Sequence, residues 1–210
     1  MRKFSIENGA TEVLLVRHAD AEHPASSATP DPALDMPLCA RGHLQARALG
    51  ERLAHRSLDA VYTSPLRRAR ETADAIVQRT ALPLTEDARL REIELGNTSV
   101  FSLHELAEIA IARGGWSHLP GAEDAQAVRS RITASIDDVV AAHPGGRVAV
   151  VSHAGTINAY ISCLLQLRHE FFFPAGNTSI SIVRAYAQER LVVTLNDIAH
   201  LETLRRNHAS

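Results

Sequence analysis

The chain has 210 residues, of which 45% are hydrophobic and 22% are charged, and its 24 acidic and 22 basic residues give a formal net charge of −2 at pH 7. This composition is typical of one globular domain over residues 1–210 and excludes a disordered, collagen-like or coiled-coil chain. The near-neutral charge excludes an overall field that would attract nucleic acid or an anionic membrane surface, so any phosphate binding must be local.

No apolar run approaches the roughly 18–20 residues needed to span a bilayer, and residues 1–12 lack the apolar core of a signal peptide. We therefore expect a cytoplasmic protein without a membrane or nucleic-acid partner. Neither of the two cysteines, Cys39 and Cys163, has a CxxC partner or a His-x-x-x-Cys cluster around it. We expect both to be buried thiols rather than part of a disulfide or metal site.

The first strand-to-helix junction lies near the N-terminus. Residues 13–16 are continuously apolar, as expected of a strand buried on both faces, and the run ends at Arg17 and His18. A stretch rich in Pro, Ala and Ser at residues 24–37 is expected to be a surface loop, and a helix is expected over about residues 41–55.

A second junction follows a short apolar run at residues 60–62. Ser64 has a side chain suited to an N-cap and Pro65 suits the first helical position, so we expect a helix to begin there. Its apolar residues recur with helical spacing and form one stripe that would face the sheet. The stripe consists of Ala69, Thr72, Ala73, Ile76 and Val77.

The second half of the chain continues the alternation of strands and helices. Its expected elements are helices at about residues 103–112 and 123–142, a strand at 148–151, and a closing pair of strands at about 179–184 and 191–195. The strand at 148–151 forms the third junction, because it ends just before His153 and helical spacing follows. This alternation is the signature of an α/β fold with a largely parallel sheet.

Residues suited to phosphate chemistry gather at the carboxyl ends of these strands, where open α/β sheets bind ligands and helix N-termini favour anions. They are Arg17, His18, Arg67 or Arg68, His153 and, on a fourth connection, Glu92. Arginine forks neutralise and orient phosphoryl oxygens, while an imidazole can attack phosphorus in line and hold the group as phosphohistidine. A carboxylic acid would protonate the departing alkoxide, and Glu92 is the candidate for that role.

Four sequence blocks, taken in order, resemble those of one known family. They read LVRHA at residues 15–19, SPLRRARETA at 64–73, LREI at 90–93 and VSHAG at 151–155. On these blocks the chain resembles the histidine phosphatase superfamily, also called phosphoglycerate mutase-like proteins. Weaker similarity at residues 38–46 and 195–201 extends the match over nearly the whole chain except about residues 97–119.

The resemblance implies a three-layer α/β/α fold with a mostly parallel central sheet. It implies that His18 is the nucleophile and that Glu92 protonates the leaving alcohol and later activates water, with His153 as the third catalytic residue. The implied phosphate pocket consists of Arg17, Arg68, His18 and His153. The resemblance implies neither a metal nor a cofactor, and it implies a small phosphorylated substrate. The oligomeric state stays open between a monomer and a homodimer.

The resemblance also sets expectations for individual side chains. The ring nitrogen of His18 that reacts must carry no hydrogen, so we expect the other nitrogen to donate its hydrogen to a backbone carbonyl. Arg68 takes the family's arginine position, which makes Arg67 a neighbour on the helix surface. His200 is expected to be a structural residue near the site.

Several positions depart from the family pattern. Ala21 and Pro24 stand where many members carry Thr or Ser and Asn, whose side chains hydrogen-bond the phosphate. The segment after Gly96 lacks the family's frequent Trp-Glu-Gly turn, which leaves the substrate open. The span from Glu92 to His153 is shorter than is usual in the mutases of the superfamily, and this favours hydrolysis over transfer back to a bound product.

We therefore predict a metal-independent phosphomonoesterase acting on a small phosphorylated metabolite. A phosphoglycerate mutase-type transferase is the first alternative, and a catalytically quiet member that binds phosphate or a partner is the second. A third alternative is a zinc or manganese site formed by His18, Asp20 and His23, because imidazoles with a carboxylate are common metal ligands.

Overall fold

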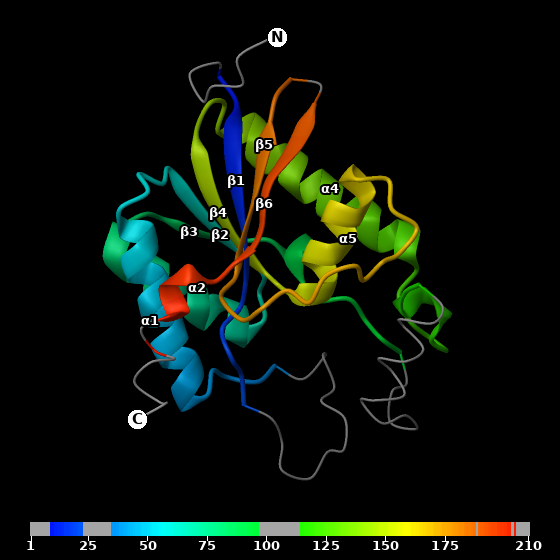
Figure 1. Ribbon diagram of the computed structural model, residues 1–210, viewed down its shortest axis with the longest axis horizontal. Coiled ribbons are helices and arrows are strands. Elements are labelled where there is room, and N and C mark those ends of the chain that lie inside the picture. The colour runs from blue at the N-terminus through cyan, green and yellow to red at the C-terminus, as the bar shows by residue number, and fades with distance from the viewer. Residues whose placement is uncertain (1–8, 23–34, 97–113, 188, 203, 205–210) are drawn as a thin grey trace.

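A computed structural model describes residues 9–22, 35–96, 114–187, 189–202 and 204. Six strands form one sheet, namely β1 (Thr11–Arg17), β2 (Ala60–Thr63), β3 (Leu84–Glu86), β4 (Arg147–Ser152), β5 (Ile180–Ala185) and β6 (Arg190–Asp197). Their order across the sheet is β3-β2-β4-β1-β5-β6 (Figure 1). The first four strands in this order are parallel, and β5 and β6 are each antiparallel to the strand before them.

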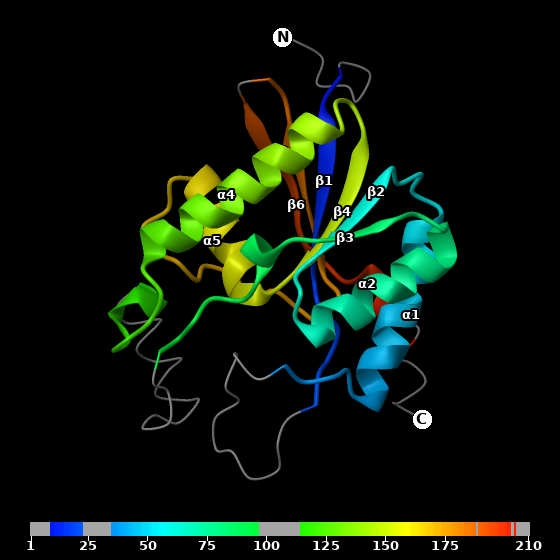
Figure 2. The ribbon, with the colours of Figure 1, turned by 180° about the vertical axis from the view of Figure 1, so that it is seen from behind.

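Helices cover both faces of the sheet. On one side lie α1 (Ala40–Ala54) and α2 (Arg67–Thr80), and on the other lie α4 (Ala125–Ala142) and α5 (Ala154–Leu164) (Figure 1 and Figure 2). Three short 3-10 helices, which the sequence reading did not anticipate, lie at Ala88–Leu90, Trp116–His118 and Ala199–Leu201. The expected three-layer α/β fold with a mostly parallel sheet is confirmed.

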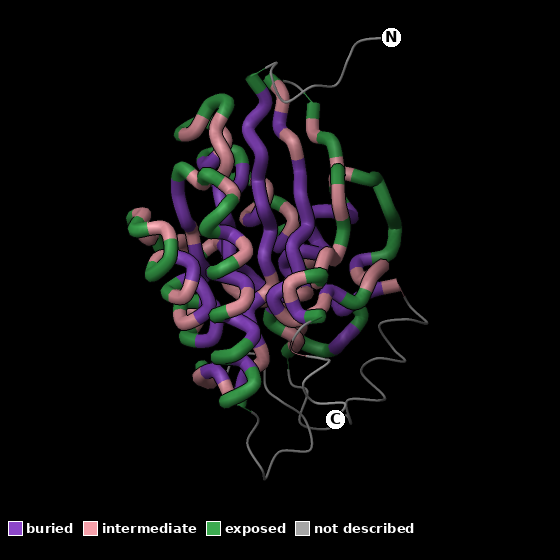
Figure 3. Tube along the Cα trace, turned by 60° about the vertical axis from the view of Figure 1, so that its left-hand side comes forward, coloured by how far each residue is buried: buried purple, intermediate pink, exposed green. Residues whose placement is uncertain are grey.

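The continuously apolar sequence of β1 is explained by its position, because both faces of this central strand are buried. Val13 and Leu15 pack against the α4 and α5 side, while Leu14 and Val16 pack against the α1 and α2 side. All four side chains are at most 1% exposed, and Figure 3 shows the central strands buried along most of their length. Since burying one such side chain is worth about 1.5–3 kcal/mol, this run fixes β1 at the centre of the sheet.

The start of α2 differs from the expectation. The helix begins at Arg67, so neither is Ser64 its N-cap nor is Pro65 its first residue. The Ser64 hydroxyl lies 2.8 Å from Nε2 of His153 and accepts a hydrogen bond from the Leu66 N–H at 3.3 Å, one residue before the helix begins. A carboxylate oxygen of Asp35 accepts the hydrogen bond from the Arg67 backbone N–H and so performs the capping role.

The two cysteines also differ from the expectation that both are buried. Cys39 is half-buried and is the N-cap of α1, where its sulfur accepts a hydrogen bond from the Gly42 N–H at 3.4 Å. Cys163 is exposed. The reason is that it lies in the last turn of α5, where the chain leaves the core and residues 165–169 are all exposed.

Most other expected elements are confirmed, including the helices at α1 and α4 and the closing strands β5 and β6. The edge strand β3 was not expected, because it has only three residues, none of them buried. The expected helix at residues 103–112, as well as His23 and Pro24, lies outside the described residues. No helix in the described ranges combines the length and apolarity needed to cross a membrane.

Candidate active site

The carboxyl ends of three parallel strands meet at one edge of the sheet. β4 pairs with β1 on one side and with β2 on the other. The backbone N–H of His18, just after β1, donates to the carbonyl of Ser152 at 2.9 Å, and that of Ser64, just after β2, donates to Val151 at 2.9 Å. The sheet thereby brings His18 and Ser64 beside His153, which follows β4.

His18 has the ring orientation that the sequence analysis expects. Its Nδ1 lies 2.7 Å from the carbonyl oxygen of Ala19. A carbonyl oxygen can only accept, so Nδ1 carries a hydrogen, and whenever the ring is neutral Nε2 has the lone pair. His18 is 7% exposed, and its ring centroid is 5.1 Å from that of His153.

His153 is buried directly behind His18. Its Nε2 contacts the Ser64 hydroxyl at 2.8 Å, while its buried Nδ1 has no hydrogen-bond partner among the described residues. Burial lowers the pKa of His153 well below its ordinary value, and charge repulsion from His18 and Arg68 lowers it further. The ring is therefore neutral at neutral pH.

Arg17 points into the same place from the end of β1. One terminal nitrogen donates to the carbonyl of Ala175 at 2.6 Å, and the buried Nε has no partner within the described part of the chain. Burial lowers the pKa of this guanidinium, whereas the carboxylates of Glu92 and Asp20 raise it. The Ser64 hydroxyl can donate to Nε2 of the neutral His153 ring, in which case Nδ1 is a donor like the nearby Arg17 Nε, and the two suit an anionic ligand.

Of the two candidate arginines on α2, Arg68 is the one that enters the site. Arg68 is 6% exposed, and burial lowers the pKa of its guanidinium while the charges of Glu92 and Asp35 raise it. Arg67 instead lies on the helix surface, where its Nε is 2.7 Å from Oε1 of Glu71. Arg68 is therefore buried and Arg67 lies on the helix surface, as the resemblance implies for this pair.

Glu92 lies half-buried against the N-terminus of α5. Its Oε1 accepts hydrogen bonds from the backbone N–H groups of Ile93 at 3.0 Å and Thr156 at 3.1 Å, and its Oε2 accepts one from Gly155 at 3.3 Å. This approach requires a glycine in α5, because a Cβ on Gly155 would lie 2.7 Å from Oε1. The free N–H groups of the helix end therefore hold the carboxylate at the site.

A second layer supports the backbone of Arg17 and His18. Thr178, a β-branched residue at φ +56°, donates its N–H to the carbonyl of Arg17 at 3.0 Å. Its hydroxyl lies 3.0 Å from Nε2 of His200, whose Nδ1 lies 3.2 Å from Arg52. Burial, followed by the charge of Arg52, lowers the pKa of His200 to about 4. A left-handed Thr is costly, so these contacts hold a strained turn beneath the site.

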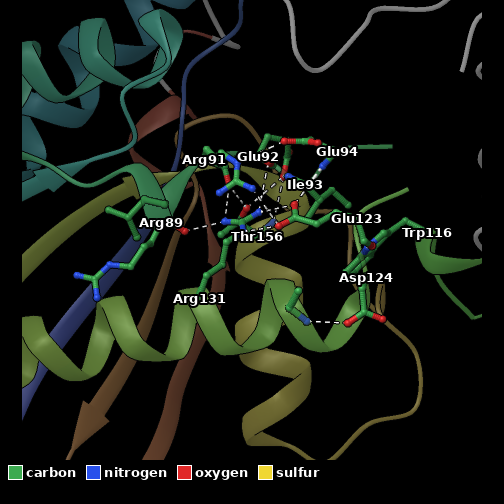
Figure 4. A network of polar contacts seen from close by, with 12 residues as sticks. Arg89, Arg91, Glu92, Ile93, Glu94, Trp116, Glu123, Asp124, Arg131 and Thr156 are labelled. Carbon is green, nitrogen blue, oxygen red and sulfur yellow. Dashed lines mark hydrogen bonds and ion pairs between the residues drawn. The ribbon is translucent and has the colours of Figure 1, made fainter. Parts of the chain in front are cut away.

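Sequence reasoning missed two residues that contact the loop carrying Glu92. They are Glu123, two residues before α4, and Arg131 within α4 (Figure 4). The available signal was the position of Arg131, three residues after Val128 and next to Ile132 on the sheet-facing stripe, where a charged side chain is unusual.

The metal-site alternative stays open, because His23 lies outside the described residues. In the ranges that the structure describes, no group of three or more His, Cys, Asp or Glu side chains is arranged to hold an ion. The Nδ1 atom of His18 is directed to the Ala19 carbonyl.

Comparison with known proteins identifies relatives of this chain. A family model described as histidine phosphatase superfamily (branch 1) matches residues 13–198. The probable phosphoglycerate mutase GpmB of Salmonella choleraesuis is 28% identical over 208 residues, which cover 91% of this chain and 95% of the relative. Bacillus stearothermophilus YhfR has a similar structure, with a TM-score of 0.78 at 26% identity over 92% of this chain and all of that one. A mycobacterial glucosyl-3-phosphoglycerate phosphatase gives a TM-score of 0.77 at 26% identity, covering 89% of this chain and 99% of that one.

Proposed function

The chain belongs to branch 1 of the histidine phosphatase superfamily, and we propose that it hydrolyses a small phosphorylated metabolite through a phosphohistidine on His18. In this proposal Arg17, Arg68 and His153 bind the phosphoryl group, and Glu92 is the general acid and then the general base. The mycobacterial phosphatase of similar structure supports hydrolysis as the reaction class.

One observation carries the proposal. The Nδ1 hydrogen of His18 is directed to the Ala19 carbonyl at 2.7 Å, so Nε2 is the nucleophilic atom. Beside this ring lies that of His153, whose buried Nδ1 has no partner among the described residues, and the Arg17 guanidinium with its unpartnered buried Nε is near enough to His153 to lower its pKa. We take the Ser64 hydroxyl as the donor to Nε2 of His153, so both unpartnered atoms are donors, and a phosphoryl group has oxygens to accept from both.

The first step transfers the phosphoryl group to the enzyme. The Nε2 lone pair of His18 forms a bond to phosphorus while the bond from phosphorus to the ester oxygen breaks. A proton on Glu92 passes to that oxygen, and the alcohol leaves. The guanidinium groups of Arg17 and Arg68 stabilise the charge that spreads over the phosphoryl oxygens in the transition state.

The second step returns the enzyme to its starting state. The Glu92 carboxylate takes a proton from water as the water oxygen forms a bond to phosphorus and the phosphorus–nitrogen bond breaks. Inorganic phosphate leaves, and Glu92 holds the proton needed for the next first step.

The contacts of Glu92 favour one oxygen as the proton carrier. Oε1 accepts two backbone hydrogen bonds, at 3.0 and 3.1 Å, whereas Oε2 accepts one at 3.3 Å. Protonation costs least where the fewest hydrogen bonds are lost, so we assign the transferred proton to Oε2. The donors at Oε1 then hold the group in place through both steps.

The proposal is tested with purified protein and para-nitrophenyl phosphate. Release of phosphate by the wild-type chain, lost in His18→Ala and retained in His43→Ala, is the expected result, because His43 is exposed on α1 outside the site. Isomerisation of phosphoglycerate without phosphate release would instead support the mutase alternative suggested by the Salmonella relative. Binding of vanadate with no turnover of any phosphate ester would indicate a catalytically quiet member.

A further inference from the structure

The guanidinium of Arg131 makes five hydrogen bonds around the loop that carries Glu92 (Figure 4). Its NH1 donates to the carbonyls of Arg89 at 2.6 Å and Arg91 at 2.9 Å, and its NH2 donates to the carbonyl of Glu92 at 3.4 Å. Nε and NH2 also donate to the two carboxylate oxygens of Glu123, at 2.8 and 3.0 Å. A guanidinium has five N–H donors, so this side chain is fully used.

The pair of Arg131 and Glu123 is nearly buried, with side chains 10% and 12% exposed. Burial alone would raise the pKa of Glu123, but the hydrogen bonds and charge of Arg131, together with the charge of Arg91 and a hydrogen bond from the Glu94 N–H, lower it overall. Glu123 thus stays ionised and neutralises the guanidinium that it orients. Such a pair is costly to desolvate and stabilises little by itself, so the hydrogen bonds that it directs to the loop are its main structural consequence.

The loop that carries Glu92 follows the 3-10 helix Ala88–Leu90, and residues 91–96 belong to no strand or helix. Side chains therefore donate hydrogen bonds to the backbone carbonyls around Glu92. Arg131 takes three of the four carbonyls between residues 89 and 92, while Ser152 donates to that of Leu90 at 2.8 Å. Thr156 donates to the Arg91 carbonyl at 2.7 Å as a second partner.

We propose that Arg131, held by Glu123, is a positioning residue that sets the carboxyl group of Glu92 for proton transfer to the leaving alcohol. This inference rests on the proposed phosphatase function. The side chain reaches from α4 to the backbone on both sides of Leu90 and to Glu92 itself, so it fixes the loop relative to α4. Without it the carbonyls of Arg89 and Glu92 lose this donor and that of Arg91 keeps only Thr156, so the carboxyl group shifts from the leaving oxygen. Proton transfer is sensitive to such a shift because it requires hydrogen-bond distance.

The test compares leaving groups of different basicity in Arg131→Met. An alkoxide needs a proton to leave, whereas para-nitrophenolate leaves without one. The value of kcat/KM reports the steps through departure of the alcohol, so for glycerol phosphate it should fall about 10²-fold and for para-nitrophenyl phosphate less than about threefold. Because water attack also needs Glu92, kcat on the nitrophenyl ester should fall and a burst of nitrophenolate should appear.

Two further variants keep the test decisive. Arg131→Lys preserves the charge but has three donors, so it should restore only part of the kcat/KM on glycerol phosphate. Arg147→Met is the matched control, since Arg147 pairs with the buried Glu12 at 2.7 Å and donates to a backbone carbonyl at the opposite end of β4. It should lower the thermal midpoint as Arg131→Met does, with the ratio of kcat/KM between the two esters unchanged.

An equal loss of kcat/KM on both esters in Arg131→Met, or the same change of ratio in Arg147→Met, would overturn the positioning role. If Arg131→Met does not fold, Glu123→Gln gives the same comparison, because it removes the charge that orients the guanidinium. Absence of wild-type activity on both esters would instead contradict the proposed function itself, so the two failures are distinguishable.

Discussion

Gly155 offers a direct way to displace Glu92 by a single methyl group. A Cβ at this position would lie 2.7 Å from Oε1 of Glu92 and 2.8 Å from both Cγ1 and Cδ1 of Ile93. Ordinary contacts of a Cβ with a neighbouring heavy atom are 3.4–4 Å long, so Gly155→Ala must push the carboxyl oxygen away by roughly 1 Å. Misplacement of that size costs about 10²-fold in rate, and we expect this loss in kcat on an alkyl phosphate.

Stability should change much less than activity in this variant. Alanine gains up to about 1 kcal/mol over glycine in a helix, while overpacking costs about 1–3 kcal/mol. The free energy of unfolding should therefore fall by no more than about 2 kcal/mol, measured by urea denaturation. Gly50→Ala is the matched control, because its Cβ would lie 2.3 Å from the carbonyl of Ala75 between α1 and α2. That variant should be destabilised with kcat unchanged, and wild-type kcat in Gly155→Ala would refute the placement of Glu92.

Three other predictions concern the site as a whole. The folded chain holds the pKa of His153 well below 6.5 and that of His200 at about 4. Below pH 6.5 the unfolded chain therefore binds more protons than the folded chain, so the free energy of unfolding should fall as pH drops from 6.5 toward 4. Equal urea midpoints across that window would contradict the burial of these rings. Arg68→Lys keeps the charge but loses the fork, so the inhibition constant for vanadate should rise roughly tenfold to a hundredfold, while Arg67→Lys, at an exposed position, should leave it unchanged. Activity should survive exhaustive treatment with EDTA, since the proposed mechanism obtains its positive charge from arginines, and loss of activity restored by zinc or manganese would favour the metal-site alternative.

The part of the fold that the sequence predicts well is the part governed by local apolar patterns. The run at residues 13–16 is buried on both faces as β1, and the helical stripe beginning at Ala69 faces the sheet in α2. The same patterns place His18 and His153 at the ends of neighbouring parallel strands. Side chains at those ends had to meet, because parallel strands share one carboxyl edge.

What the sequence could not predict depends on contacts between distant segments. Ser64 has the side chain of an N-cap, yet α2 begins three residues later, the Ser64 hydroxyl contacts His153 and the Leu66 N–H, and Asp35 accepts from the first N–H of the helix. The role of Arg131 is also non-local, since its carbonyl partners lie some forty residues earlier in the chain. The local sequence pattern does not predict which distant backbone group a side chain will contact in the folded chain.

The same limit applies at the surface of the core. Cys163 was expected to be buried on composition alone, but it falls in the last turn of α5 where the chain leaves the core. The edge strand β3 has three residues and no buried side chain, so no periodic pattern of apolar residues predicts it. Element ends and edges are therefore where pattern alone is weakest.

The most direct measurement is to trap the covalent intermediate and locate it. Glu92→Gln, mixed with radiolabelled para-nitrophenyl phosphate and quenched in alkali, should accumulate label on the peptide containing His18, because the nitrophenyl group leaves without an acid but water attack lacks its base. No label should attach to the same protein carrying His18→Ala. Label on a different residue, or phosphate released by the wild-type chain with no labelled protein in either form, would contradict the account.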